Sequence, residues 1–199
     1  MRKRDCLTTA NPRLNQIVLV GTFLGFSWLA MQAVHELGHV IGAAASGGTV
    51  NKVVLYPTAI SRTDVRPNPH PLVEVWSGAA LGAILPLIAF LAAAMLRCPG
   101  LYLFRFFAGF CLVANGVYLG LGSFQGIADA GELLMHGAAR WQLVLFGIAT
   151  VPLGLYLWHG QGRHFGFGEA RGKVSRAATV VSLSLFVVVV VVEMLIGSR

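Results

Sequence analysis

Charged residues are scarce in this sequence. Only 12% of its 199 residues are Asp, Glu, Lys or Arg, which is about half the share of an ordinary soluble domain. Hydrophobic residues make up 56%, and the mean hydropathy is +0.71. This balance argues against a soluble globular domain and predicts an integral membrane protein with several spans of about 20 residues each. We expect residues 1–199 to form a single membrane-embedded domain, because the length leaves no room for a further soluble one.

Cysteine is also rare, and basic residues outnumber acidic ones. Cys6, Cys98 and Cys111 are widely spaced and form no CxxC pair, so the sequence predicts neither a disulfide framework nor a cysteine zinc site. The formal net charge is +7, but the basic residues stand in short groups at the ends of apolar runs. We therefore expect no nucleic-acid partner and attribute these residues to membrane topology.

Five apolar segments are long enough to cross a lipid bilayer. They are residues 17–45, 72–96, 101–122, 141–158 and 177–196. The last is rich in valine, yet we predict a helix, because an isolated strand would leave its backbone groups unpaired in lipid. After the first segment, residues 50–56 and 59–65 are β-prone and flank Pro57, which predicts a short hairpin. The expected fold class is an all-α polytopic membrane protein with about five transmembrane helices and this hairpin after the first.

Lysine and arginine near the segment ends predict the orientation. Ten lie on the side of the amino terminus and of residues 160–175, and five lie on the opposite side. The positive-inside rule then predicts a cytoplasmic amino terminus and a hairpin outside. No small-residue cleavage site follows the basic residues 2–4, so we expect the first apolar segment to be a retained anchor.

The sequence HELGH at residues 35–39 carries the chemistry. On a helix, His35 and His39 direct both imidazoles to one place, and Glu36 lies beside His39. Two neutral imidazoles, a third protein ligand and a water would complete a tetrahedral zinc site, and the glutamate could transfer the water's proton. Three ionisable side chains in a membrane span are costly unless they are paired or bind an ion. A metal site is therefore favoured over a cluster that only packs the bundle.

The third protein ligand must come from another segment. Six ionisable side chains near the membrane are candidates: Asp64, His70, Glu74, Asp129, Glu132 and His136. We expect Asp64 and His70 to lie too close to water, in the hairpin and its proline-rich exit, whereas Glu74 begins the second span and stays a candidate. Asp129 and Glu132 are three residues apart and would face broadly one way on a helix, so spacing does not separate them.

Two further features concern packing and access. Gly78 and Gly82 form a small-xxx-small pair, which predicts close helix packing. The hairpin is consistent with an ordinary surface element and equally with a strand that pairs with an extended substrate. Such pairing would matter because a peptide bond within a helix is poorly accessible to a nucleophile.

On these residues the chain resembles the site-2 protease family of intramembrane zinc metalloproteases, most closely its compact bacterial branch. The resemblance rests on HELGH in an early span, Gly47-Gly48 with the hairpin, SGAALG at residues 77–82, and GIADAGELL at residues 126–134 followed by Trp141. It implies that Asp129 is the third zinc ligand. The chain departs from the family pattern in having alanine on both sides of Asp129, where Leu-Asp-Gly is common, and in lacking a proline after Asn115. The resemblance also implies zinc near the cytoplasmic face, whereas the charge count places it in the outer half.

The sequence therefore predicts a zinc metalloendopeptidase of the bacterial cell membrane. It would hydrolyse peptide bonds of membrane-protein substrates through a zinc-bound water, with zinc (Zn2+) held by His35, His39 and Asp129 and with Glu36 as general base and then general acid. The alternative is a metalloprotease-like membrane protein that serves as a non-proteolytic binding, chaperone or transport component. The intact Glu36 argues against that alternative.

Overall fold

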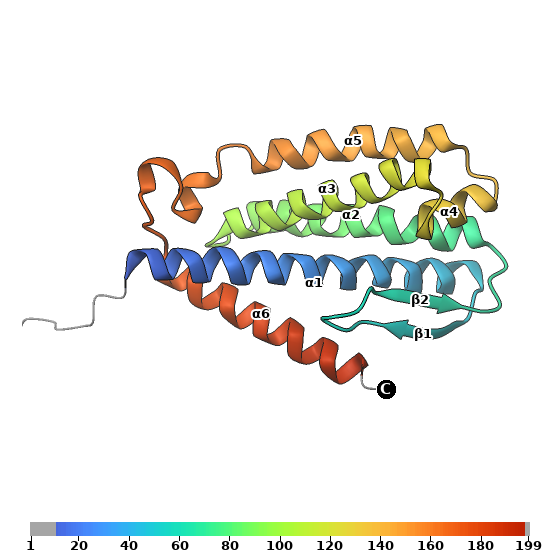
Figure 1. Ribbon diagram of the computed structural model, residues 1–199, viewed down its shortest axis with the longest axis horizontal. Coiled ribbons are helices and arrows are strands. Elements are labelled where there is room, and N and C mark those ends of the chain that lie inside the picture. Colours follow the sequence, from blue (N-terminus) through green and yellow to red (C-terminus); the bar gives the residue numbers. More distant parts are fainter. Residues whose placement is uncertain (1–10, 198–199) are drawn as a thin grey trace, which may run out of the picture.

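A computed structural model describes residues 11–197 of the chain (Figure 1). Within these residues, five helices are long and apolar enough to cross a membrane: α1 (Pro12–Ser46), α2 (Pro71–Met95), α3 (Leu101–Gln125), α5 (Arg140–Trp158) and α6 (Arg176–Gly197). A hairpin of β1 (Val50–Val54) and β2 (Arg62–Val65) follows α1. The predicted fold of a multi-pass α-helical membrane protein with a hairpin after the first span is thus confirmed. The basic residues 2–4 and Cys6 lie outside the described residues.

The first helix is longer than the sequence predicted. It has 35 residues and so runs about 50 Å, well beyond the roughly 30 Å hydrocarbon core. The Asn11 side chain accepts a hydrogen bond from the Arg13 backbone N–H at its start. Gly47, with a left-handed φ of 81°, ends it, as glycine commonly does after a helix. A helix of this length must tilt in the bilayer or extend beyond the hydrocarbon core.

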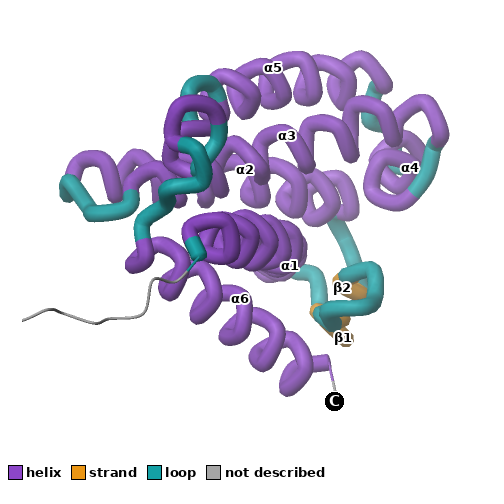
Figure 2. Tube along the Cα trace, turned by 60° about the vertical axis from the view of Figure 1, so that its left-hand side comes forward, coloured by secondary structure: helices purple, strands orange, loops and turns teal. Residues whose placement is uncertain are grey.

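The long helices stack in the order α5, α3, α2, α1 and α6 (Figures 1 and 2). The helix α6 starts beside the beginning of α1, where the Thr22 and Ser182 hydroxyls share a hydrogen bond of 2.7 Å. It then diverges from α1 toward its carboxyl end (Figure 1). Consequently α1 has α2 on one side along its length, and α6 on the other side near its start.

Glycines on α1 and α2 allow these two helices to touch through their backbones. A Cβ on Gly38 of α1 would lie 2.8 Å from the Gly78 Cα of α2, a distance at which atoms clash. Gly78 in turn packs against the His39 ring, and Gly82 packs against the Asn115 side chain of α3. The close packing predicted for Gly78 and Gly82 is confirmed, and both glycines make room for polar side chains of the neighbouring helices.

The hairpin lies alongside the second half of α1 (Figure 1). Its strands are antiparallel, with Val53 opposite Thr63, and both are shorter than the predicted β-prone stretches. The strands stop where residues 55–61 form the connecting loop. The Ser61 backbone N–H donates to the Gln32 side chain at 3.4 Å, which helps to hold the hairpin against α1.

A short helix lies in the chain connection from α3 to α5 and packs against α3 and α2. It is α4 (Ala128–Met135), and it follows Gly126, whose left-handed φ of 64° ends α3. Ala130 and Leu133 of α4 are buried in a core cluster with residues of α2, α3 and α5. This packing fixes the direction of α4 and sets Asp129 in its first turn. Two short 3-10 turns, η1 (Gly162–Phe165) and η2 (Gly168–Ala170), lie between α5 and α6.

Candidate metal centre

Three ligand atoms converge near the hairpin end of the bundle. The distance from His35 Nε2 to Asp129 Oδ2 is 2.9 Å, and that from His39 Nε2 to the same oxygen is 3.3 Å. The two imidazole Nε2 atoms are 3.1 Å apart. His35, His39 and Asp129 are thereby positioned to hold a metal ion.

The two histidines come from one face of α1 and the aspartate from the first turn of α4. His35 and His39 are one helical turn apart, so their side chains project in the same direction, and both residues are buried. Asp129 stands 94 residues away from His35 in the sequence. The Asp129 backbone N–H lies 3.5 Å from the Tyr118 hydroxyl, at the limit of a hydrogen bond, and the Tyr118 ring packs edge-on against His35.

The charge state of Asp129 suits a metal ligand. Burial by itself would raise the pKa of its carboxyl group, but hydrogen bonds to His35 and His39 reverse the shift and hold the pKa well below its usual range. The carboxyl group is therefore ionised at neutral pH, which is the form that binds a cation.

Asn115 of α3 orients His35 from behind. Its Nδ2 donates to the Cys111 carbonyl at 2.9 Å, so its Oδ1 faces His35 Nδ1, at 2.7 Å. A carbonyl oxygen can only accept, so His35 carries a proton on Nδ1. Its Nε2 faces Asp129 Oδ2 across the hydrogen bond of 2.9 Å, and a metal ion bound there would replace the proton in that bond, as in metal sites whose histidines are held by an outer partner.

Glu74 of α2 takes the corresponding place behind His39. Its Oε1 lies 2.8 Å from His39 Nδ1, although the angle is too bent for an aligned hydrogen bond. We therefore treat the contact as mainly electrostatic. The other Glu74 oxygen accepts from Asn68 at 3.2 Å. Glu74, a candidate third ligand by sequence, thus faces the imidazole nitrogen that points away from the convergent group.

Glu36 adjoins the group without belonging to it. Its side chain is buried, with the residue 3% exposed, and its Oε2 accepts a hydrogen bond of 2.7 Å from the Thr63 hydroxyl of β2. The hairpin therefore contacts the glutamate that the motif marks as the base. Sequence reasoning did not assign a role to Thr63 or Asn115. Asn115 had a detectable signal, as a polar residue inside an apolar span, whereas Thr63 in a polar hairpin had none.

The other candidate ligands lie outside the group. The Asp64 side chain is about half exposed and pairs with Arg62 at 3.4 Å on the hairpin, and His70 and His136 are exposed. Glu132 is one turn after Asp129, and its pKa is raised by burial and by the nearby charges of Glu74 and Asp129. As expected, Asp64 and His70 do not reach the convergent group.

No protein-family model, curated protein or solved structure matches this chain. The resemblance to the site-2 protease family therefore stays a prediction, based on the motifs given above.

Proposed function

We propose that the chain is an intramembrane zinc metalloendopeptidase of the site-2 protease type, acting on membrane-protein substrates. The observation that carries the proposal is the convergence of His35 Nε2, His39 Nε2 and Asp129 Oδ2 beside the buried Glu36. A buried site with three ligands and an adjacent carboxylate is the arrangement used by zinc peptidases.

The donor set and its spacing fit zinc. Zn–N and Zn–O bonds of about 2.0–2.2 Å at tetrahedral angles put ligand atoms about 3.3 Å apart. The three observed separations are 2.9, 3.1 and 3.3 Å, so the ligands need to move outward by only a few tenths of an ångström. Three protein ligands leave one tetrahedral position open, which distinguishes catalytic from structural zinc sites. When bound there, zinc would supply Lewis-acid polarisation and acidify a water molecule.

The residues around the ligands have separate tasks in this proposal. Asn115 and Glu74 hold the two imidazoles with Nε2 toward the metal position. Glu36 accepts a proton from the attacking water while the water oxygen bonds to the peptide carbonyl carbon. As the C–N bond breaks, Glu36 passes that proton to the amine leaving group. Thr63 orients the Glu36 carboxylate through its hydrogen bond.

The hairpin is also where an extended substrate could be held. A substrate strand that pairs with an outer edge of the hairpin would expose peptide bonds that a helix conceals. The Thr63 contact places β2 next to Glu36, so a strand bound there would run close to the proposed base. The substrates we propose are membrane proteins, or the membrane-anchored remnants of proteins already cut once.

We further propose that the amino terminus is cytoplasmic, in a bacterial membrane. The start of α1, the α2–α3 connection and the α5–α6 connection lie at one end of the bundle, opposite the hairpin (Figure 1). Seven exposed or partly exposed basic residues gather at that end: Arg13, Arg97, Arg105, Arg163, Arg171, Lys173 and Arg176. The positive-inside rule then places the metal group in the outer half of the membrane.

Metal analysis combined with substrate cleavage tests the proposal. The full chain is purified as wild type and as the His35→Ala, His39→Ala and Glu36→Gln variants. Zinc content is then measured by mass spectrometry, and cleavage of truncated single-span membrane proteins is followed in vesicles. We expect both histidine variants to lose zinc, and Glu36→Gln to keep zinc but lose cleavage, because it leaves the ligands in place and removes the base.

Three outcomes would count against the proposal. Equal zinc content in all four proteins would show that the motif does not bind the metal. Full cleavage by Glu36→Gln would remove Glu36 from the mechanism. Zinc bound by a wild-type chain that cleaves none of the substrates would favour the alternative of a binding, chaperone or transport component.

A further inference from the structure

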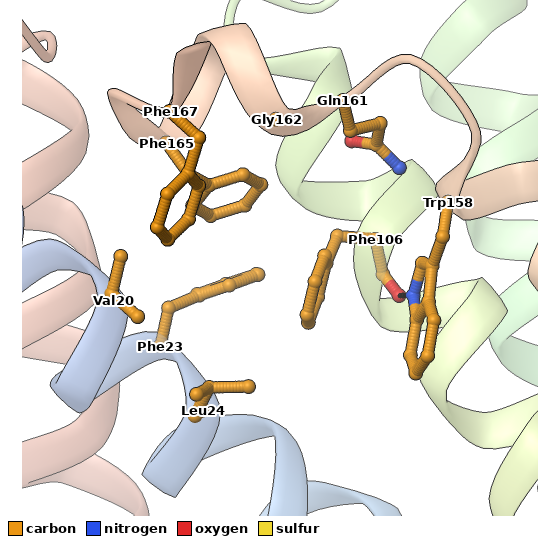
Figure 3. Close-up of a pocket in the computed structure, with 9 residues that line it drawn as sticks. All are labelled: Val20, Phe23, Leu24, Phe106, Trp158, Gln161, Gly162, Phe165 and Phe167. Atoms are coloured by element: carbon orange, nitrogen blue, oxygen red, sulfur yellow. Dashed lines mark hydrogen bonds between the residues drawn. The ribbon is translucent and has the colours of Figure 1, made fainter. Parts of the chain in front are cut away.

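An apolar cavity of about 280 Å³ lies at the basic end of the bundle, away from the metal group (Figure 3). Its walls come from α1, α3, the end of α5 and the η1 segment, and five aromatic side chains contribute to them: Phe23, Phe106, Trp158, Phe165 and Phe167. Phe106 stacks on Trp158 with ring centroids 5.3 Å apart, and Trp158 Nε1 donates to the Phe106 carbonyl at 3.0 Å. The aromatic wall is therefore rigid.

The cavity opens toward the outside of the bundle and has one buried polar group. Leu24 and Phe167 line it and are 44% and 55% exposed. Gln161 is the polar side chain in its wall. It is buried, and its Oε1 has no hydrogen-bond partner. The volume is slightly below the roughly 300–1,000 Å³ of ligand pockets. It therefore suits a segment of an apolar chain rather than a whole lipid.

A second, basic hollow lies nearer the amino-terminal start of α1. Arg13, Gln16 and Ile17 of α1 line it together with Arg171 and Gly172. Neither arginine lies within ion-pair distance of a carboxylate in the described part of the chain. Within residues 11–197, the hollow therefore presents two arginines that have no carboxylate partner.

The two hollows follow one another along a single face of α1. Arg13, Ile17, Val20 and Leu24 are spaced by four, three and four residues, so they form one stripe of the helix, and the stripe lines both hollows. The α5–α6 connection covers both from the other side: residues in and beside η1 line the apolar cavity, and Arg171 and Gly172, just after η2, line the basic hollow. This connection is tied to α1 by a hydrogen bond of 3.0 Å from Gln16 Nε2 to the Phe165 carbonyl. From Arg13 to Leu24 the stripe rises about 17 Å, which is close to half of the roughly 30 Å hydrocarbon core.

We propose that the apolar cavity and the basic hollow together form one groove that binds one anionic phospholipid. The headgroup phosphate lies between Arg13 and Arg171 at the membrane surface, and a segment of one acyl chain enters the aromatic cavity in the same leaflet. Charge complementarity selects the anionic headgroup, since basic side chains near the surface attract anionic lipids by about fivefold in affinity for each residue. The groove's length matches one leaflet and its apolar depth matches an acyl chain.

Trp158 gives a direct readout, because lipids with brominated acyl chains quench a tryptophan that they touch. Trp158 is made the only tryptophan by changing Trp28, Trp76 and Trp141 to Phe, and the full chain is reconstituted in mixed vesicles. Either the phosphatidylglycerol or the phosphatidylcholine component carries bromine, at matched mole fractions. We expect phosphatidylglycerol to be enriched at Trp158 by at least about fivefold over phosphatidylcholine.

Two variants test whether the lipid preference depends on Arg13 and Arg171 or only on the overall positive charge at this end of the bundle. Arg13→Gln/Arg171→Gln should abolish the preference, whereas Arg97→Gln, an exposed arginine at the same end outside both hollows, should keep it. Helical content by circular dichroism checks that each variant is folded. Soluble inorganic phosphate, which lacks an acyl chain, should leave the quenching unchanged.

Three results would overturn the proposal. Equal quenching by both brominated lipids in the wild-type background would mean that only ordinary surrounding lipid contacts Trp158. A preference retained by the double arginine variant would remove the proposed headgroup site. Loss of the preference in soluble phosphate would identify a free-anion site instead. None of these readouts depends on zinc or on peptide cleavage.

Discussion

Replacing Gly78 with alanine should disable the metal site without touching a ligand. The glycine packs directly against the His39 ring. A Cβ built at residue 78 would lie 2.5 Å from His39 Cε1 and 2.7 Å from Cδ2, with Nε2 nearer still. Ordinary contacts begin at about 3.4 Å. The ring must therefore retreat by at least about 0.9 Å, or α2 must move away from α1.

Such a displacement is large for a metal ligand. Metal–ligand distances hold to within about 0.2 Å, so the expected shift exceeds that tolerance several-fold. Movement of α2 away from α1 would lose the close backbone packing that Gly38 and Gly78 allow, and this loss opposes the movement. We expect Gly78→Ala to weaken zinc binding by more than the 10–100-fold that follows loss of an outer-shell partner.

The assay is a zinc titration against a competing chelator on purified protein, with thermal unfolding measured in parallel. Gly82→Ala offers a graded comparison. Its Cβ would meet the Asn115 amide at 2.9–3.2 Å, which disturbs only the partner of His35, so about 10–100-fold is expected. Gly21→Ala is the control, because nothing lies within 4 Å of its Cβ. Wild-type zinc affinity in Gly78→Ala would refute the reasoning, since the imidazole would then not need its observed position.

Three further predictions concern the third ligand, the base and the orientation. Asp129→Ala should lose zinc while Glu132→Ala keeps it, as measured by zinc stoichiometry; the reverse result would move the ligand one turn later. Thr63→Val should keep full zinc content but lower kcat for peptide cleavage by about tenfold, because an orienting hydrogen bond to the base is lost; an unchanged kcat would show that Thr63 only docks the hairpin. In a background free of the native cysteines, Ala59→Cys in the exposed hairpin loop should react with an impermeant thiol reagent only from the outside, and labelling only from the cytoplasmic side would reverse the orientation.

Local patterns in the sequence determine the helices and two of the candidate ligands. Apolar runs of this length must be helical because lipid offers no partners to backbone groups, and the structure bears this out for all five segments. The pairing of His35 and His39 also follows from the helical period alone. Neither conclusion depends on how the helices pack, so the sequence was sufficient for both.

Residue spacing did not separate Asp129 from its competitors; the family resemblance favoured it, and only the tertiary structure brings its carboxylate to the two histidines. Glu132 has nearly the same helical phase, and Glu74 is just as close to a span. The turn at Gly126 and the burial of Ala130 and Leu133 direct α4 so that the Asp129 carboxylate meets the histidines.

The packing of α2 and of the hairpin against α1 also decides which side chains surround the candidate ligands and Glu36. The close approach of α1 and α2 at Gly38 and Gly78 sets Glu74 behind His39, and the docked hairpin brings Thr63 to Glu36. These relations join segments far apart in the chain, and they depend on which side chains leave room for backbones to touch. A short-range pattern records helix phase but not the position of one helix against another, so the sequence left these relations open and the packing decided them.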